Sequence, residues 1–136
     1  MRLIHLLTTF MLAGILLSCS SKNEDADLKR PSNREVRQLY ELATSDNFEK
    51  ITAKMASCKD MPATYTEEMQ NALKMHAQQI KQTKGGIKGF SVNDIEAFRS
   101  DDGYAADAHI QVEYNDSTTE EILFRLVYDN GKWILR

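Results

Sequence analysis

The chain has 136 residues, 42% of them hydrophobic, and 17 Lys and Arg stand against 20 Asp and Glu, for a formal net charge of −3. This length is enough for one domain with a single core and too short for several. The mildly acidic balance, with no clustered basic segment, excludes most nucleic-acid-binding classes, which need a positive surface to neutralise phosphates.

The N-terminus reads as a targeting segment. Arg2 supplies a positive charge, residues 3–17 are mostly apolar, and this stretch is shorter than the roughly twenty residues of a membrane-spanning helix. It ends in Leu16-Leu17-Ser18-Cys19, which resembles the lipobox of bacterial lipoprotein precursors. The resemblance implies a signal peptide over 1–18 and lipidation of Cys19. The alternatives are an ordinary signal peptide cut elsewhere and a single anchor helix.

Residues 19–30 are small and charged, so they bury too little apolar surface to fold, and we expect a flexible tether behind the lipidated cysteine. Ser20, rather than Asp, follows Cys19, which favours outer-membrane delivery by similarity to enteric lipoproteins. Lys22-Asn23-Glu24-Asp25 resembles a degenerate form of the surface-export signal of Bacteroidetes lipoproteins. A merely soluble linker explains it equally well, so the periplasmic and surface faces both stay open. The expected partner of this end of the chain is the membrane, through the lipid anchor.

Cys19 and Cys58 are the two cysteines of the chain. Lipidation would consume Cys19, and an intramolecular disulfide would then be excluded. We expect Cys58 to act as a small buried hydrophobic residue rather than as a reactive or dimerising thiol.

Three helices are predicted at the start of the domain, which we place at 31–136. Ser32 and Glu35 form a capping box ahead of a first helix, and Asp46-Asn47-Phe48-Glu49 offers an N-cap, with an acid three residues on, for a short second helix. Thr64 and Glu67 suggest another capping box, at the start of a long third helix that Gly85-Gly86 ends. The apolar positions of the three helices are Val36, Leu39, Tyr40 and Ala43, then Phe48, Ile51 and Met55, then Tyr65, Met69, Ala72, Leu73, His76 and Ile80.

Downstream of the glycines the apolar period changes to two, which predicts strands. A first strand holds Phe90 to Phe98, with a kink or bulge at Asn93-Asp94. The even positions of 104–114 are apolar and most odd positions are polar, so one face should meet a core. A third strand follows through Tyr128, and Asp129-Asn130-Gly131 predicts a hairpin turn into a last strand with Trp133. The fold class is therefore α+β, with three helices packed on a curved four-stranded antiparallel sheet.

This order of elements, with the hairpin Leu126-Val127-Tyr128-Asp129-Asn130-Gly131-Lys132-Trp133-Ile134-Leu135, resembles small bacterial lipoproteins of the lumazine-binding-like and nuclear-transport-factor-two-like superfamily. The resemblance implies a cone in which a curved sheet wraps around a long helix. Catalytic members carry an Asp-His or Asp-Tyr set inside the cone, and no such motif can be matched here.

The candidate site is a polar pocket inside the cone. Its side chains are those placed on inward faces by the helical and strand patterns, namely His76, Tyr65, Tyr104, Tyr114 and Tyr128. An imidazole beside phenols in a dry cavity can transfer protons or orient a ligand. The alternative, a boundary histidine and tyrosines with their hydroxyls at the edge of the core, is more common.

No metal or cofactor is expected. Asp107, His109 and Glu113 share the outward face of one strand, but they lack further converging donors, so a solvated face is the favoured interpretation.

Three functions follow from this sequence. The first is a non-catalytic binding or scaffold module that recognises a small hydrophobic ligand or an envelope protein. The second is an isomerase or hydrolase that uses His76 and an inward tyrosine, which requires an open cavity at His76. The third is a homodimer formed through Leu123, Val127 and Ile134 on the outer face of the sheet.

Overall fold

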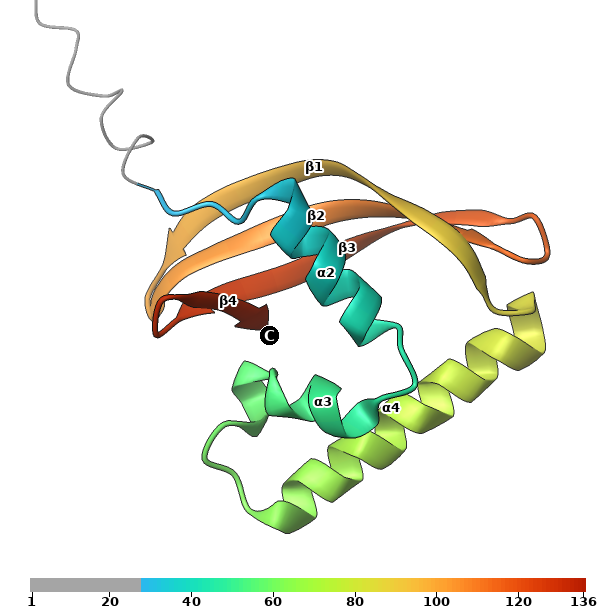
Figure 1. Ribbon diagram of the computed structural model, residues 1–136, viewed down its shortest axis with the longest axis horizontal. Helices are drawn as coiled ribbons and strands as arrows, with labels where there is room; N and C mark the ends of the chain where they lie inside the picture. Colours follow the sequence, from blue (N-terminus) through green and yellow to red (C-terminus); the bar gives the residue numbers. More distant parts are fainter. Residues whose placement is uncertain (1–27) are drawn as a thin grey trace, which may run out of the picture.

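The computed structural model describes residues 28–136, so the predictions for the signal peptide, for Cys19 and for most of the tether lie outside the described residues. Within these residues, four helical segments precede four strands. Their bounds are α2 Asn33–Ala43, α3 Phe48–Ala53, the 3-10 helix η1 Ala56–Cys58, α4 Ala63–Lys84, β1 Ile87–Ser100, β2 Gly103–Tyr114, β3 Thr119–Asp129 and β4 Lys132–Leu135. Figure 1 shows how the helices lie on one side of the sheet. The predicted α+β class, with helices packed on an antiparallel sheet, is confirmed.

Helix α2 begins as predicted. The Ser32 hydroxyl accepts a hydrogen bond from the Glu35 amide at 3.1 Å, and the Glu35 carboxylate accepts one from the Ser32 amide at 2.7 Å. This capping box satisfies two amides that the first turn leaves without a helical partner. The helix then buries one stripe, formed by Val36, Leu39 and Tyr40.

Helix α3 begins in the predicted segment, but its cap is Asn47, which accepts from the Lys50 amide at 3.1 Å, rather than Asp46, the residue three before Glu49. The helix ends at Ala53, so Met55 lies beyond it. Helix α4 begins after Pro62 without a side-chain cap. The predicted box at Thr64 does not form, because Thr64 already lies inside the helix. Gly85, with φ 77°, ends α4 in the left-handed conformation that the glycine pair predicted.

The sheet is a meander in the order β1-β2-β3-β4, antiparallel throughout. A register shift between Val92 and Asp94 confirms the irregularity predicted in the first strand. In the β3–β4 turn, Asn130 and Gly131 have φ values of 49° and 79°, and a tight hairpin of this kind requires positive φ at both central positions.

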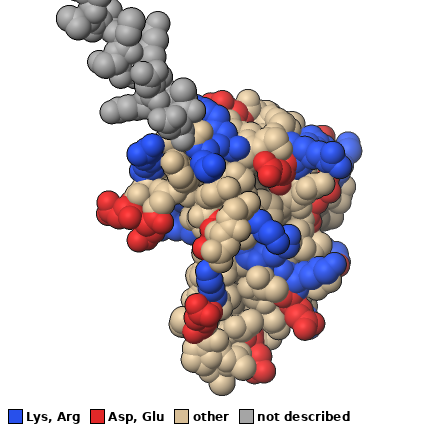
Figure 2. All heavy atoms as spheres, turned by 60° about the vertical axis from the view of Figure 1, so that its left-hand side comes forward, with Lys and Arg blue, Asp and Glu red and all other residues tan. Residues whose placement is uncertain are grey.

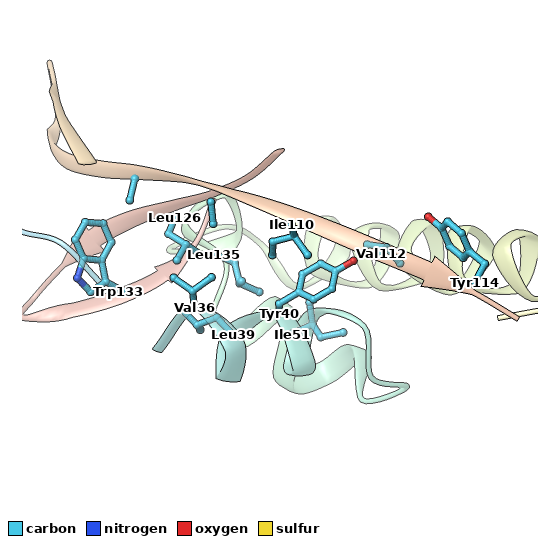
Figure 3. Packing of buried hydrophobic residues seen from close by; sticks show 12 residues of the cluster. Val36, Leu39, Tyr40, Ile51, Ile110, Val112, Tyr114, Leu126, Trp133 and Leu135 are labelled. Atoms are coloured by element: carbon cyan, nitrogen blue, oxygen red, sulfur yellow. The ribbon is translucent and has the colours of Figure 1, made fainter. Parts of the chain in front are cut away.

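The core lies between α2 and the face of the sheet turned toward it (Figure 3). Val36 of α2, Ile110 and Val112 of β2, and Leu126 of β3 are fully buried. The Tyr40 ring packs edge-on between Phe90 and Phe124, with centroid distances of 4.7 and 5.1 Å. Such edge-to-face pairs add to the apolar burial, so Tyr40 locks α2 to the sheet.

Helix α4 is placed differently from the sequence-based expectation. None of its residues is buried, and it packs mainly beneath α3 rather than on the sheet (Figure 1). Gln70 of α4 donates to the Thr52 hydroxyl of α3 at 3.0 Å, and Asn115 of the β2–β3 turn donates to the Gly85 carbonyl at 2.8 Å. The shorter α2 therefore fills the concave side of the sheet. Within residues 28–136, no helix has the length and apolar character needed to cross a bilayer.

Candidate functional site

An apolar groove of about 540 Å³ opens between α3, α4 and the middle of β3, at Phe124 and Arg125. Its walls carry side chains of α2, α3, η1 and α4 and of the strands β3 and β4: Ala43, Ile51, Met55, Ser57, Met69, Leu73, Phe124, Arg125, Leu135 and Arg136. Most of these are aliphatic, aromatic or thioether groups. We call this cavity the apolar groove.

The groove exists because β4 is short. β4 pairs only with Leu126–Asp129 of β3, so within the described residues Thr119–Arg125 has no strand on its outer edge. At the last residue of β4 the Leu135 amide donates to the Lys54 carbonyl at 2.9 Å, which brings Met55 beside Leu135. Met69 and Leu73 of α4 form the opposite wall.

Two arginines border the groove. The Arg125 guanidinium donates to both oxygens of Asp107, with 2.7 Å between Nη2 and Oδ2. This hydrogen-bonded pair lowers the pKa of Asp107 below its usual range and raises that of Arg125, so both stay charged. Within residues 28–136, no carboxylate side chain lies within ion-pair distance of Arg136.

A second cavity of about 500 Å³ lies on the other side of Met55 and is more polar. Thr52, Thr66 and Gln70 line it, together with the ion pair of Lys59 with Asp129, in which Nζ and Oδ2 are 2.8 Å apart. Cys58 also lines this cavity and is half-buried and free, rather than fully buried as expected.

The structure brings only some of the predicted pocket residues together. Tyr104 and Tyr128 meet edge-on, with centroids 6.2 Å apart, at one end of the sheet. Tyr114 ends β2 at the opposite end, about 33 Å away at the usual rise of a strand. Tyr65 lies at the start of α4, and His76 is exposed on α4.

His76 lines neither of these cavities, so the open cavity that the enzymatic hypothesis requires is not found at this residue in either of them. Leu73 and Ile80 of the same helix are partly buried against the core, whereas His76 is exposed.

The buried phenols are held neutral. Burial, together with a 2.7 Å hydrogen bond to the Glu120 carboxylate, raises the pKa of Tyr114 to about 12. Burial and the negative charge of Glu120 raise the pKa of Tyr40 to about 12 as well. Neither phenol can therefore serve as a base near neutral pH, which suits a structural role.

The three polar side chains expected on the outward face of β2, Asp107, His109 and Glu113, have different surroundings. Asp107 is 8% exposed and paired with Arg125, and Glu113 lies 3.6 Å from the Lys88 ammonium. His109 lies instead between Glu96 of β1 and Glu121 of β3. The solvated face expected here is wrong for Asp107.

Acidic and basic side chains are interspersed on the face of the molecule seen in Figure 2.

No family model matches this chain, and no curated protein matches it. A solved structure from Campylobacter jejuni, named "Putative NTF2-like transpeptidase", superimposes with a TM-score of 0.57 at 14% identity, covering 76% of this chain and 97% of that one. The chain has the NTF2-like cone fold. Aln2 from a Streptomyces species aligns at 17% identity with a TM-score of 0.42, over 79% of this chain and 90% of that one.

This likeness confirms the predicted cone architecture. The groove residues that sequence reasoning missed belong to segments that are distant along the chain. Met55 and Phe124 were recognised as apolar, but their proximity depends on how far β4 extends along β3. No local signal in the sequence reports that length difference.

Proposed function

We propose that this chain is a lipid-anchored envelope protein whose cone-fold domain is a non-catalytic binding module, and that the apolar groove is its ligand site. The observation that carries the proposal is the groove itself, a cavity of about 540 Å³ with a mostly apolar lining. Its volume falls within the range of small-molecule sites, roughly 300–1,000 Å³.

The chemistry of the groove favours a small hydrophobic ligand. Phe124 and Leu135 supply apolar surface from the sheet, and Met55 and Met69 supply flexible thioethers from the helical side. Methionine side chains adapt to ligands of different shape, which suits binding without a fixed reaction geometry. Arg136 at the border would favour a ligand whose polar end carries negative charge.

The anchor part of the proposal rests on the Leu16-Leu17-Ser18-Cys19 run. Three acyl chains on Cys19 would hold the protein at the membrane durably, since one chain alone binds only marginally. Ser20 supports the outer membrane as the destination. A groove tethered to a bilayer would face ligands that partition into lipid.

The groove can be tested with the chain from residue 19 onward carrying Cys19→Ser, so that neither lipid nor detergent competes. A dansylated fatty acid should bind this protein at one equivalent. Leu73→Gln, in the groove wall, should weaken binding at least about tenfold, because it replaces apolar contact with an amide that has to be desolvated.

The matched control is Met75→Gln on the same helix, at a side chain that is 70% exposed. It should leave the affinity for the probe unchanged. Equal affinity for the wild type and Leu73→Gln would place the ligand elsewhere and remove the groove from the proposal.

A further inference from the structure

A second constellation lies on the face of the sheet turned away from the helices, which we call the outer face. His109 occupies the middle of β2, with Asp94 of β1 as its cross-strand neighbour. His109 Nε2 lies 3.7 Å from Glu96 Oε1, and His109 Nδ1 lies 3.3 Å from Glu121 Oε1. One ligand atom each from Asp94, Glu96 and His109 lie within 4.8 Å of one another.

The irregularity in β1 creates this arrangement. Val92 faces the core opposite Ile110, and the register shift after it places Asp94, rather than Asn93, opposite His109. Because side chains alternate along a strand, Asp94 and Glu96 then lie on the same outer face. The extra residue therefore brings two carboxylates to one imidazole.

The local charge is unbalanced. Other carboxylates of the sheet have basic partners, since Asp107 pairs with Arg125, Glu113 with Lys88 and Glu120 with Lys84. In the described part of the chain, no Lys or Arg pairs with the carboxylates around His109, which are those of Asp94, Glu96 and Glu121. Three carboxylates around one imidazole leave net negative charge that a bound cation would neutralise.

We propose that Asp94, Glu96 and His109 bind a divalent transition metal of the Zn²⁺ type. Tetrahedral zinc with ligand bonds of about 2.0–2.2 Å holds its donors roughly 3.3–3.6 Å apart, close to the distance between His109 Nε2 and Glu96 Oε1. The remaining donors close in by rotation of exposed carboxylates. The nitrogen donor selects zinc-like metals over Mg²⁺ and Ca²⁺, which prefer oxygen donors alone.

Glu121 acts as a positioning residue. Its carboxylate lies 3.3 Å from His109 Nδ1 and accepts a hydrogen bond from it in the tautomer protonated there, which leaves the lone pair on Nε2, the nitrogen beside Glu96. A carboxylate bound to the second nitrogen is the usual means by which a metal-ligating histidine is oriented, and its loss typically weakens metal binding 10- to 100-fold.

Calorimetry with ZnCl₂ on the full-length protein, purified in detergent with a tag free of histidine, tests the site. We expect one Zn²⁺ per chain, no comparable binding of Mg²⁺ or Ca²⁺, and loss of binding in His109→Gln and Glu96→Gln. Glu121→Gln should weaken binding about 10- to 100-fold. The matched controls His76→Gln and Glu113→Gln remove an imidazole and an acid elsewhere and should bind as the wild type does.

A measurement on the unaltered protein removes any dependence on how the variants fold. Zn²⁺ should shift the ¹⁵N resonance of His109 Nε2 and leave that of His76 unchanged. Undiminished binding in His109→Gln, a shift at His76 instead, or no Zn²⁺ binding at millimolar metal would each overturn the site.

Discussion

Replacing Leu126 by alanine tests which face of β3 carries the core. Leu126 is fully buried in one cluster with Leu135 and Val36 (Figure 3), and its cross-strand neighbour on β2 is the small Ala106. The Ala106 side chain is too small to fill the space that the substitution leaves. The loss should therefore lie well within the range for buried leucines, at about 3–4 kcal/mol of unfolding free energy.

The same change at Leu123 is the matched control, because Leu123 lies on the same strand, faces outward and is 55% exposed. Its cost should stay within about 0.5 kcal/mol. For a domain of this size, Leu126→Ala should lower Tm by roughly 15–25 °C and Leu123→Ala by no more than about 4 °C.

Urea unfolding followed by circular dichroism measures both differences on one pair of variants. A Leu123→Ala loss equal to that of Leu126→Ala, or a Leu126→Ala loss below about 1 kcal/mol, would refute the assignment of the core to this face.

Three further predictions concern the start of α2, the Asp107–Arg125 pair and lipidation of Cys19. Ser32→Ala should cost about 1 kcal/mol in urea unfolding because α2 loses its cap, whereas Thr64→Ala, inside α4, should cost nothing measurable; equal losses would contradict the observed helix starts. Because the pKa of Asp107 is lowered in the fold, its pair with Arg125 stabilises the fold fully above the ordinary Asp pKa of about 3.9, and this contribution is lost as pH falls through the lower folded value. The difference in unfolding free energy between the wild type and Asp107→Asn, measured in urea, should therefore shrink in acid. A constant difference down to pH 2 would contradict this expectation. In a bacterial host, full-length protein should incorporate an alkyne-tagged fatty acid and Cys19→Ala should not; label retained in that variant, read by in-gel fluorescence, would end the lipoprotein proposal.

Features set by neighbours in the sequence could be predicted. The Ser32–Glu35 box and the Asn130-Gly131 turn each depend on a few adjacent residues, and both are present. The strand faces also followed from alternation, because a one-residue error in register would expose the whole apolar set of β2.

Features set by distant contacts could not be predicted. The apolar stripe of α4 predicts a buried face, yet none of its residues is fully buried and the helix contacts α3 more than the sheet, and the pattern does not name the surface that the stripe meets. The expected tyrosine pocket failed because strand alternation gives a shared face but not proximity, and Tyr104 and Tyr114 sit at opposite ends of β2.

The carboxylates around His109 were missed for a related reason. Along β2 the nearest acids are Asp107 and Glu113, and each has a basic partner of its own. The acids that approach the imidazole belong to β1 and β3, and their proximity depends on an extra residue in β1. Cross-strand partners of this kind become visible only once the register is known.

Because β4 is short, part of β3 has no neighbouring strand within the described residues, and this matters when many copies of the protein lie close together. The uncovered edge of β3 displays amide and carbonyl groups that another extended chain could join by strand addition. Glu120, Glu121 and Arg125 line this stretch, and charged side chains on an edge discourage unintended pairing with identical copies. Neutralising Glu121 would therefore remove a safeguard against aggregation, whereas neutralising Glu120 would also change the acceptor of the buried Tyr114 hydroxyl.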